Sequence, residues 1–403
     1  MSKQSILIVH NYYQIPGGED TVVANEKKML EDNGHKVVLY TRNNNEIKTM
    51  NVFRKILLPF TSIYSFKTAR EIKRIIKEEN IDIVHVHNTL SLISPSVYYA
   101  AVKMNKPVVQ TIHNFRMLCP GATFYRDGHI CEDCVSKGLR CSLKHKCYRN
   151  SFIQTLVCVI STKIHRTTGI YSKINYICLT EFNKNKLLQL KQIKPERVFV
   201  KPNFSPLTNV CNNIDQNNID DSKDYFLFVG RLEQIKGINF LVSAWKQQKN
   251  LNKELIICGE GPLENEIRKY INENNISNTK LMGYTNHSKV MELMKKAKAL
   301  LFTSVVYEAF PMTIIEAFSQ GLPVISSDIG NGAQLIEDGK TGIKYKYGNK
   351  ESLLEAINKI SKLNLKENVI REYKNKYTDE KNYKLLFKIY NDIYMGKENE
   401  QNI

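Results

Sequence analysis

The chain has 403 residues, and at about 150 residues per domain this length indicates two or three domains. Hydrophobic residues make up 42% and charged residues 24%, an ordinary globular composition that excludes a disordered, fibrous or disulfide-stapled chain. The net charge of +18 is uneven: residues 1–202 hold 31 of 58 Lys and Arg but 15 of 40 Asp and Glu, so they carry +16 and the remainder +2. This excess indicates an anionic partner for the first half (nucleic acid, anionic lipid or a phosphorylated substrate), or else an ordinary Lys-rich surface.

The N-terminus does not resemble a signal peptide, because the apolar run Ser5–His10 is short and leads directly into a polar loop. No apolar run reaches the roughly 18 residues of a spanning helix. We therefore expect a protein of the reducing cytoplasm, where cysteines are thiols or metal ligands and not disulfides.

Short β-branched runs alternate with helical patterns in the first half of the chain. This alternation of apolar strands and helices predicts a parallel sheet covered on both faces. The predicted strands are Ile6–Val9, Lys36–Tyr40, Ile81–Val86, Pro107–Ile112 and Tyr176–Leu179, with helices over about Asp20–Asn33 and up to about Glu79.

The same alternation restarts after about residue 203. The predicted strands are Tyr225–Val229, Glu254–Cys258, Ala299–Phe302 and Pro323–Ile325, a polar loop covers Asn209–Asp224, and a final apolar-striped helix covers about Thr378–Tyr394. The fold class is therefore α/β, with two doubly wound parallel sheets facing across a cleft. Ligands of such sheets bind beyond the carboxyl ends of the strands.

Two basic residues follow the first strand of the second half, in the run Gly230-Arg231-Leu232-Glu233-Gln234-Ile235-Lys236-Gly237. The planar fork of Arg231 and the compact charge of Lys236 suit a diphosphate. The alternative is a loop whose basic side chains are only solvated.

Two carboxylates surround the start of a later helix. Pro311 fits its first turn, where the free backbone amides form an anion site. Glu308 precedes this helix and Glu316 lies within it, where both can accept hydrogen bonds from sugar or ribose hydroxyls. Alternatively, Glu308 caps the helix and Glu316 is merely exposed.

These motifs together resemble glycosyltransferase family 4, the retaining, nucleotide-sugar-dependent enzymes of the GT-B fold with two Rossmann-like domains. The resemblance covers most of residues 225–345 and rests on Gly230-Arg231 with Lys236-Gly237, Cys258-Gly259-Glu260-Gly261-Pro262-Leu263, Glu308-x₇-Glu316 with Phe310-Pro311, and Gly321-Leu322-Pro323-Val324-Ile325. The family's Glu-Gly-Phe-Gly variant reads Glu-Ala-Phe-Pro here.

The resemblance implies a role for each matching residue. Arg231 and Lys236 would hold the donor diphosphate, Glu308 the hydroxyls of the transferred sugar, and Glu316 those of the ribose. His113, which follows the strand Pro107–Ile112, would face the donor sugar and diphosphate, although a lone histidine at a strand end is usually structural. The implied catalytic residues are His113, Glu308, Arg231 and Lys236, and the implied donor-binding residues are Gly17, Gly18, Glu19, Gly230, Tyr284, Phe310, Pro311, Met312, Thr313 and Glu316.

The first strand leads into Gly17-Gly18-Glu19, which resembles the family's N-terminal loop and would let a ligand approach the start of a helix. His85 and His87 point to one face of their strand. Metal ligation would require a third ligand that the sequence does not identify, so we expect both histidines at the strand edge near the cleft.

The implied reaction is a same-face displacement that retains the anomeric configuration, with the leaving phosphate oxygen helping to deprotonate the acceptor. Arg231, Lys236 and helix amides would then stabilise the departing diphosphate. No cofactor and no divalent ion is expected for catalysis, and the chain has no Asp-x-Asp motif.

Residues 115–150 form an insert that the α/β pattern does not explain. Five of the nine cysteines lie here, at Cys119, Cys131, Cys134, Cys141 and Cys147, and Cys131-x₂-Cys134 has the spacing of a metal knuckle. A structural zinc held by four of them is one interpretation. A dithiol or partly buried thiols are the other.

Basic residues lie beside apolar ones in Phe53–Phe60 and near Lys163–Arg166. Together with the +16 excess, they suit an anionic membrane surface and a lipid-linked acceptor, whereas ordinary core packing is the alternative. We expect an acceptor-side domain over 1–202, a nucleotide-sugar domain over 203–376, and a helix over 377–403 that packs back on the first domain.

The sequence thus predicts a cytoplasmic glycosyltransferase, peripheral at the inner membrane face. It would move a sugar from a UDP-, GDP- or ADP-sugar to a glycan or lipid-linked acceptor in capsule, exopolysaccharide or O-antigen synthesis. A basic metal-knuckle protein that binds nucleic acid lacks a recognisable module here, so we expect no nucleic-acid partner. The Glu-x₇-Glu spacing argues against the alternative interpretation, a nucleotide-sugar epimerase of the GT-B fold.

Overall fold

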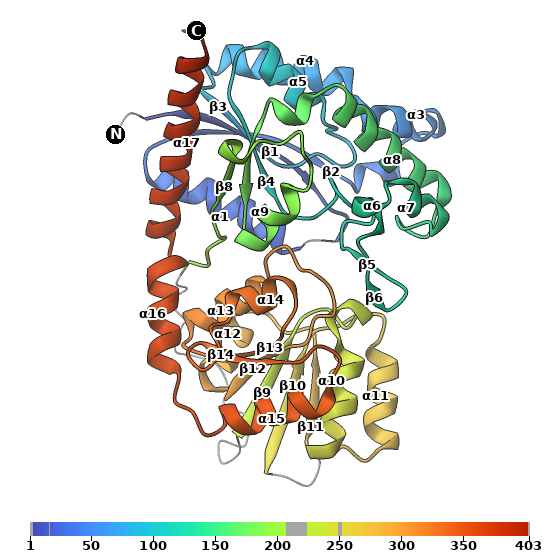
Figure 1. Cartoon of the computed structure of the whole chain (residues 1–403), viewed down its shortest axis with the longest axis vertical. Helices are drawn as coiled ribbons and strands as arrows, with labels where there is room; N and C mark the ends of the chain where they lie inside the picture. Colours follow the sequence, from blue (N-terminus) through green and yellow to red (C-terminus); the bar gives the residue numbers. More distant parts are fainter. Residues whose placement is uncertain (1–2, 16, 207–223, 249–251, 402–403) are drawn as a thin grey trace. The chain divides into compact units, whose positions relative to one another are not determined.

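The computed structural model describes residues 3–15, 17–206, 224–248 and 252–401 (Figure 1). The chain divides into two compact units, one formed by Met1–Asn203 with Asp379–Ile403 and the other by Phe204–Thr378. Each unit contains a six-stranded parallel sheet with helices. The predicted α/β class with two Rossmann-like domains is therefore confirmed.

The first unit is built on a sheet in the order β2-β1-β3-β4-β7-β8. Its central strands are almost entirely buried, and Ile6 to Val9 are fully buried, as expected for a parallel sheet covered on both faces. The strands are β1 (Ser5–Tyr12), β2 (Lys36–Asn43), β3 (Ile83–Asn88), β4 (Val108–Ile112), β7 (Asn175–Cys178) and β8 (Val198–Val200).

The helices of this unit connect and cover the strands. They are α1 (Gly18–Asp32), α2 (Glu46–Thr49), α3 (Val52–Ile63), α4 (Phe66–Glu78), α5 (Ser96–Lys103), α8 (Phe152–Thr167), α9 (Glu181–Leu187) and α17 (Asp379–Gln401), with short 3₁₀ turns at Ile170–Ser172 and Pro195–Arg197. The final helix α17 packs on α1 and buries Leu386, Phe387 and Tyr390.

Residues 115–150 form an irregular lobe of the first unit. It contains a two-stranded hairpin, β5 (Tyr125–Arg126) with β6 (His129–Ile130), and two short helices, α6 (Asp133–Ser136) and α7 (Arg140–Lys144). Six of its residues other than glycine have positive φ, namely Ala122, Phe124, Asp127, Lys146, Arg149 and Asn150. Such conformations are costly without surrounding support.

The second unit repeats the architecture with the order β11-β10-β9-β12-β13-β14. The strands are β9 (Asp224–Val229), β10 (Lys253–Cys258), β11 (Thr279–Gly283), β12 (Ala299–Phe302), β13 (Val324–Ser327) and β14 (Gly342–Tyr345). The helices are α10 (Ile238–Trp245), α11 (Glu264–Glu273), α12 (His287–Lys296), α13 (Met312–Ser319), α14 (Gly330–Leu335), α15 (Lys350–Ile360) and α16 (Lys366–Lys376), with 3₁₀ turns at Gln234–Lys236 and Lys246–Gln248.

Several predicted boundaries were wrong. The strand expected to begin at Ile81 begins at Ile83 and ends at Asn88, and the region before Glu79 holds three helices. Strands β8, β11 and β14 were not predicted. Strand β8 has only three residues, and β11 and β14 each contain a glycine and a single β-branched residue. The polar loop predicted over Asn209–Asp224 lies outside the described residues except for Asp224, which begins β9.

Candidate active site

The loops that leave neighbouring strands of the second unit pack closely at the carboxyl edge of its sheet. The loop after β9 meets the loop after β10, where the backbone N–H of Leu232 donates to the carbonyl of Glu260 at 3.0 Å. A Cβ at Gly259 would lie 2.0 Å from the carbonyl oxygen of Gly230. Only glycine allows this approach, because real Cβ atoms do not come so close to a backbone oxygen.

The turn that carries Lys236 is fixed in the same way against the loop after β12. Gly237 has φ +69°, and a Cβ there would lie 2.0 Å from the carbonyl oxygen of Thr303. The Thr303 hydroxyl donates to the carbonyl of Lys236 at 3.0 Å, and the backbone N–H of Val305 donates to the carbonyl of Ile235 at 3.0 Å. The position of Lys236 is therefore set by two strand ends at once.

The structure brings two of the expected catalytic residues into contact. Nζ of Lys236 lies 2.7 Å from Oε1 of Glu308, and both side chains are partly exposed. Arg231 follows β9 in the same loop, and its Nε lies 2.8 Å from Oε1 of Glu233 with half of the side chain exposed. Both basic groups are thus reachable by an anion at this edge.

The turn that contains Glu308 is held by a residue that the sequence did not single out. Nδ2 of Asn331, in α14, donates to the backbone carbonyls of Glu308 and Ala309. Asn331 is fully buried. No recognised motif contains it, so the sequence offered no signal for this contact.

Helix α13 begins one residue later than expected. Pro311 is its N-cap residue and Met312 its first residue, so the expectation of Pro311 within the first turn was wrong. No side chain caps this helix, and the carboxylate of Glu308 contacts Lys236. Phe310 is buried and packs on Tyr377. The backbone amides at the start of the helix are those of Met312 and Thr313.

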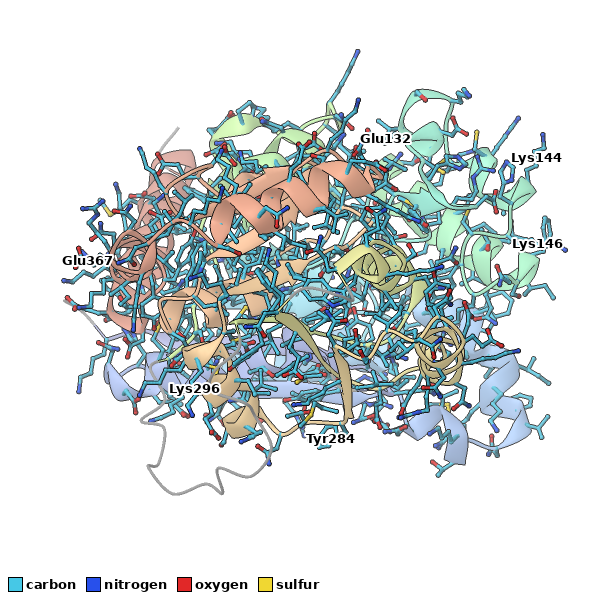
Figure 2. The ribbon with its side chains drawn as sticks, turned by 90° about the horizontal axis from the view of Figure 1, so that it is seen from below. Glu132, Lys144, Lys146, Tyr284, Lys296 and Glu367 are labelled. Carbon is cyan, nitrogen blue, oxygen red and sulfur yellow. The ribbon has the colours of Figure 1, made fainter. Side chains whose placement is uncertain are left out.

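Glu316 has a partner that the sequence also did not reveal. Its Oε1 lies 3.5 Å from Nε2 of His287, the first residue of α12. The hydrogen bond with Glu316 raises the pKa of His287 above its ordinary value. Tyr284 precedes α12, and its side chain is exposed at the surface (Figure 2).

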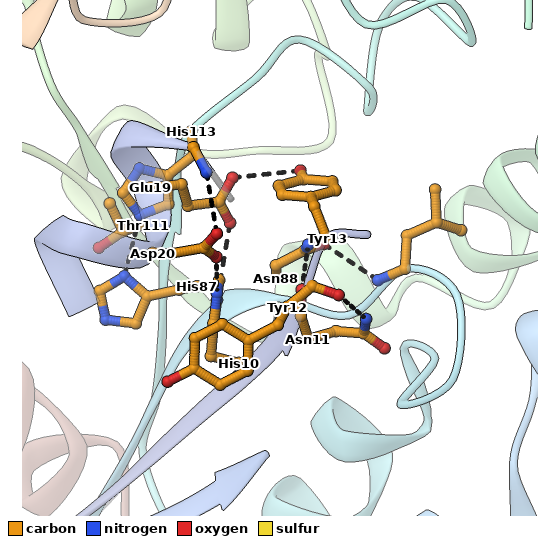
Figure 3. Close-up of polar contacts among 12 residues, drawn as sticks. His10, Asn11, Tyr12, Tyr13, Glu19, Asp20, His87, Asn88, Thr111 and His113 are labelled. Carbon is orange, nitrogen blue, oxygen red and sulfur yellow. Dashed lines mark hydrogen bonds and ion pairs between the residues drawn. The ribbon is translucent and has the colours of Figure 1, made fainter. Parts of the chain in front are cut away.

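A second polar cluster lies at the carboxyl edge of the first unit, where β1 leads into α1 (Figure 3). Nε2 of His10 lies 2.7 Å from Oδ1 of Asp20, whose Oδ2 accepts the backbone N–H of Gly17 at 3.0 Å. A Cβ at Gly17 would meet no protein atom within 4 Å, so packing within the unit does not require glycine there.

Glu19 is held within this cluster. The Tyr13 hydroxyl donates to its Oε2 at 3.1 Å, and its Oε1 lies 3.7 Å from Nδ1 of His10. Burial raises the pKa of Glu19 to about 8, helped by the neighbouring charge of Asp20. Glu19 is therefore mostly protonated at neutral pH.

His113 lies just beyond β4, as expected, and faces β3. Its Nε2 lies 2.9 Å from Nδ1 of His87. Burial and the neighbouring His87 hold the pKa of His113 well below its ordinary value, so the ring is neutral at pH 7. His87 and His113 line a pocket of about 100 Å³ together with Asn88, Ser62 of α3 and Thr162 of α8.

His85 and His87 were expected at a strand edge, and this was wrong because both are buried. Both contact Glu26 of α1, whose Oε1 lies 3.0 Å from Nδ1 of His85 and 3.3 Å from Nε2 of His87. Their ligand atoms lie close enough for a metal, and Glu26 would be the third ligand that the sequence did not identify. However, Nζ of Lys201 already lies 3.0 Å from Oε2 of Glu26, and a buried ammonium group opposes a cation there.

The cysteines of residues 115–150 gather within the irregular lobe. Cys119 and Cys134 are buried and the other three are half-buried, and none of them forms a disulfide. Burial and the neighbouring Cys119 raise the pKa of Cys134 to about 12. No three sulfur atoms of the lobe lie within 4.8 Å of one another among the described residues. Lys144 and Lys146 of this lobe point outward (Figure 2).

Helices α3 and α8 lie side by side in the first unit and form an exposed face, here called the α3–α8 face (Figure 1). Its exposed apolar residues are Val52, Phe53, Ile56, Leu57, Phe60, Phe152, Ile153, Ile160 and Ile164, and its exposed basic residues are Arg54, Lys55 and Lys163. Neither helix contains Asp or Glu. Within the described part of the chain, no helix is long and apolar enough to cross a membrane.

Comparisons with known proteins identify relatives along nearly the whole chain. An uncharacterized glycosyltransferase of Methanocaldococcus jannaschii is 26% identical over 96% of this chain and 98% of its own. An uncharacterized 42.6 kDa protein in the cps region of Klebsiella pneumoniae is 27% identical over 77% of this chain and 75% of its own.

Solved structures have the same fold. A glycosyltransferase from Rickettsia africae superposes with a TM-score of 0.71 at 18% identity and covers 98% of this chain and 99% of its own. The Anabaena protein HepE in complex with UDP-glucose superposes with a TM-score of 0.61 at 15% identity, over 98% of this chain and 100% of its own. These similarities identify the GT-B fold.

Two family descriptions match the chain at positions that include both polar edges. "Glycosyltransferase Family 4" matches residues 16–128, which contain Gly17, Glu19 and His113. "Glycosyl transferases group 1" matches residues 211–377, which contain Arg231, Lys236, Glu308 and Glu316. Together they match more than half of the chain, and the protein therefore belongs to the family 4, group 1 glycosyltransferases.

Proposed function

We propose that this glycosyltransferase moves a sugar from a nucleotide-sugar donor to a glycan or lipid-linked acceptor in cell-surface polysaccharide synthesis. The transfer retains the anomeric configuration and takes place at the inner face of the cytoplasmic membrane. The contact between Lys236 and Glu308 at the carboxyl edge of the second sheet carries this proposal.

The donor assignment rests on the charges at that edge. Arg231 and Lys236 supply the forked and the compact cation that a diphosphate requires, and a phosphate oxygen would share Lys236 with Glu308. Glu308 and Glu316 accept hydrogen bonds from hydroxyl groups, and the amides at the start of α13 add anion-binding donors. The related fold of HepE is found in complex with UDP-glucose, which supports this class of donor.

Stabilisation of the leaving diphosphate is then the main catalytic effect. The leaving phosphate oxygen takes the proton of the acceptor hydroxyl as the sugar is attacked from the same face. His113 and the Gly17-Gly18-Glu19 loop of the first unit would contribute to donor binding, and the open space beside Gly17 suits a ligand.

The acceptor assignment rests on the α3–α8 face. Phe53, Phe60 and Ile153 are each about 70% exposed, which is unusual for large apolar side chains unless they contact a membrane or a partner. Basic residues without neighbouring acidic ones add attraction to anionic lipids of roughly 1 kcal/mol each. Ser62 and Thr162 of the same helices line the pocket of His113. The relative in a cps region supports polysaccharide synthesis.

A donor screen tests the proposed transfer. Purified protein is offered UDP-, GDP- and ADP-sugars, and the free nucleotide is measured. With the donor that the protein accepts, Lys236→Ala and Glu308→Gln should each reduce turnover at least about 100-fold, because each variant loses one or two charged hydrogen bonds. Lys269→Ala serves as the matched control, because Lys269 forms an exposed pair with Glu273 on α11. Normal turnover in both site variants would refute the assignment.

Two further measurements address the stereochemistry and the membrane. The anomeric configuration of the product, read by NMR, should equal that of the donor, and inversion would contradict the mechanism. Co-sedimentation with vesicles that contain anionic lipid should be lost in Phe53→Ser/Phe60→Ser but kept in Met395→Ser, an exposed apolar control on α17. Equal binding by both variants would exclude the α3–α8 face.

A further inference from the structure

A continuous line of buried polar groups leads from α17 to His113 within the first unit. Nζ of Lys201 lies 3.0 Å from Oε2 of Glu26, and Oε1 of Glu26 lies 3.3 Å from Nε2 of His87. Nδ1 of His87 lies 2.9 Å from Nε2 of His113. Asn382 of α17 accepts a second hydrogen bond from Lys201 at 2.9 Å.

The charge of Glu26 is fixed by its surroundings. Burial alone would raise the pKa of Glu26, but the ammonium group of Lys201 and the contacts with His85 and His87 hold it well below its ordinary value. Burial lowers the pKa of His87 to about 4. At neutral pH, Glu26 is therefore an anion and His87 a neutral imidazole, which carries its proton on only one of its two nitrogens.

The carboxylate of Glu26 decides which nitrogen of His87 carries the proton. A proton on Nε2 lies beside the anion and is attracted to it, whereas a lone pair on Nε2 would face the anion in a site closed to solvent. Nε2 of His87 is inaccessible to solvent and forms no hydrogen bond with another described group, and Oε1 of Glu26 lies 3.3 Å from it. A lone pair that faced the anion there would be unfavourable. Nδ1 of His87 consequently carries the lone pair.

The tautomer of His113 follows from that of His87. Because Nδ1 of His87 is an acceptor, Nε2 of His113 must be the donor in the 2.9 Å contact. The Nδ1 of His113 then carries a lone pair, and no protein group within the described residues forms a hydrogen bond with it. We propose that Glu26 and His87 are positioning residues that fix His113 as a hydrogen-bond acceptor at Nδ1.

This inference rests on the proposed transferase function and sharpens the role of His113. A neutral imidazole with an outward lone pair repels phosphate oxygens and accepts a hydrogen bond from a hydroxyl group. His113 therefore recognises a sugar hydroxyl and not the diphosphate. The hydroxyl belongs either to the donor sugar or to the acceptor, and kinetics separates the two.

The first test reads the tautomer directly and needs no turnover. Full-length protein labelled with ¹⁵N-histidine is studied at pH 7.5 by long-range ¹⁵N–¹H correlation, and His113→Asn assigns one of the nine histidines. Nε2 of His113 should be protonated and Nδ1 bare. A proton on Nδ1 would overturn the inference even if transfer occurs. A protein without transferase activity but with the expected tautomer would refute only the proposed function.

The second test removes the charge that orients the pair. Glu26→Gln/Lys201→Met takes away both buried charges together, and Lys201→Met alone removes the ammonium group that lowers the pKa of Glu26. We expect the double variant to lose the single His113 tautomer and about tenfold or more in kcat/KM, and Lys201→Met to weaken the tautomer as well, because the pKa of Glu26 then rises. In a His113→Ala background the double variant should cause no further loss. An equal loss in both backgrounds would show a purely structural effect and overturn the proposal.

His113→Ala itself identifies the source of the hydroxyl. Slower nucleotide release without acceptor assigns it to the donor sugar, and a loss confined to transfer assigns it to the acceptor. Unchanged rates in both assays would refute recognition by His113.

Discussion

Gly237 is the residue whose replacement most directly tests how the donor loop is built. It has φ +69° and an added Cβ would lie 2.0 Å from the carbonyl oxygen of Thr303. Gly348 of the same unit has nearly the same φ, +72°, but a Cβ there would meet nothing within 4 Å. Gly237→Ala and Gly348→Ala therefore share the backbone penalty and differ only in the steric contact.

The difference between the two variants can be calculated from the hydrogen bonds near Gly237. The left-handed backbone costs alanine about 1 kcal/mol in both variants. Relief of the overlap in Gly237→Ala must separate the two loops by roughly 1 Å and weaken three hydrogen bonds: Val305 to Ile235, Thr303 to Lys236 and Ser304 to Ile235. At about 1 kcal/mol each, these add about 3 kcal/mol of destabilisation.

The single tryptophan allows the second unit to be observed by itself. Trp245 is fully buried in α10, which begins directly after Gly237. Urea unfolding followed by its fluorescence should show a midpoint lowered by about 1–2 M in Gly237→Ala relative to Gly348→Ala, given the usual dependence on denaturant. Equal midpoints for the two variants would refute the close packing of these loops and the fixed position of Lys236 derived from it.

Three other predictions concern titration and metal. Because burial raises the pKa of Glu19 to about 8, the folded state binds more protons than the unfolded state between pH 4.5 and 8, and stability falls as pH rises through this range. Glu19→Gln should therefore raise the Tm at pH 9 and change it little at pH 4.5, and an unchanged Tm at pH 9 would contradict a buried carboxylate. The His287 pKa, followed by NMR, should fall toward its ordinary value in Glu316→Gln, and no change would exclude their contact. The structural zinc stays a prediction: elemental analysis should find one zinc per chain, lost in Cys134→Ser but kept in Cys178→Ser, a buried cysteine of β7, and metal-free wild type would leave the lobe held by thiols alone.

The part of the site that could be predicted consists of residues that directly follow strands. The carboxyl ends of parallel strands meet at one edge, so any polar residue at such an end lies near the others whatever the exact strand boundaries are. Arg231, Lys236 and Glu308 follow β9 and β12, which are neighbours in the sheet. The contact of Lys236 with Glu308 across 72 residues of sequence is a consequence of this topology.

The residues that were missed lie on helices, where the sequence does not determine the partner. Glu26 is in the middle of α1, and its burial depends on how that helix packs against β3 and α17. A change of one residue in the face that α1 presents would remove Glu26 from His87, since successive residues of a helix point about 100° apart. His287 and Asn331 likewise depend on the packing of α12 and α14.

This difference explains why the sequence predicts the groups that would contact the donor better than the residues that set the protonation of those groups. Groups that would contact the donor are found from strand ends, but the protonation of His113 depends on Glu26, which lies two contacts away through His87. If Glu26 orients His87, the last helix of the chain has a chemical role besides packing, because Asn382 and Tyr390 of α17 contact Lys201 and His85. Substitutions in α17 that preserve its apolar residues but remove these polar contacts should then alter the tautomer of His113 while the unit remains folded.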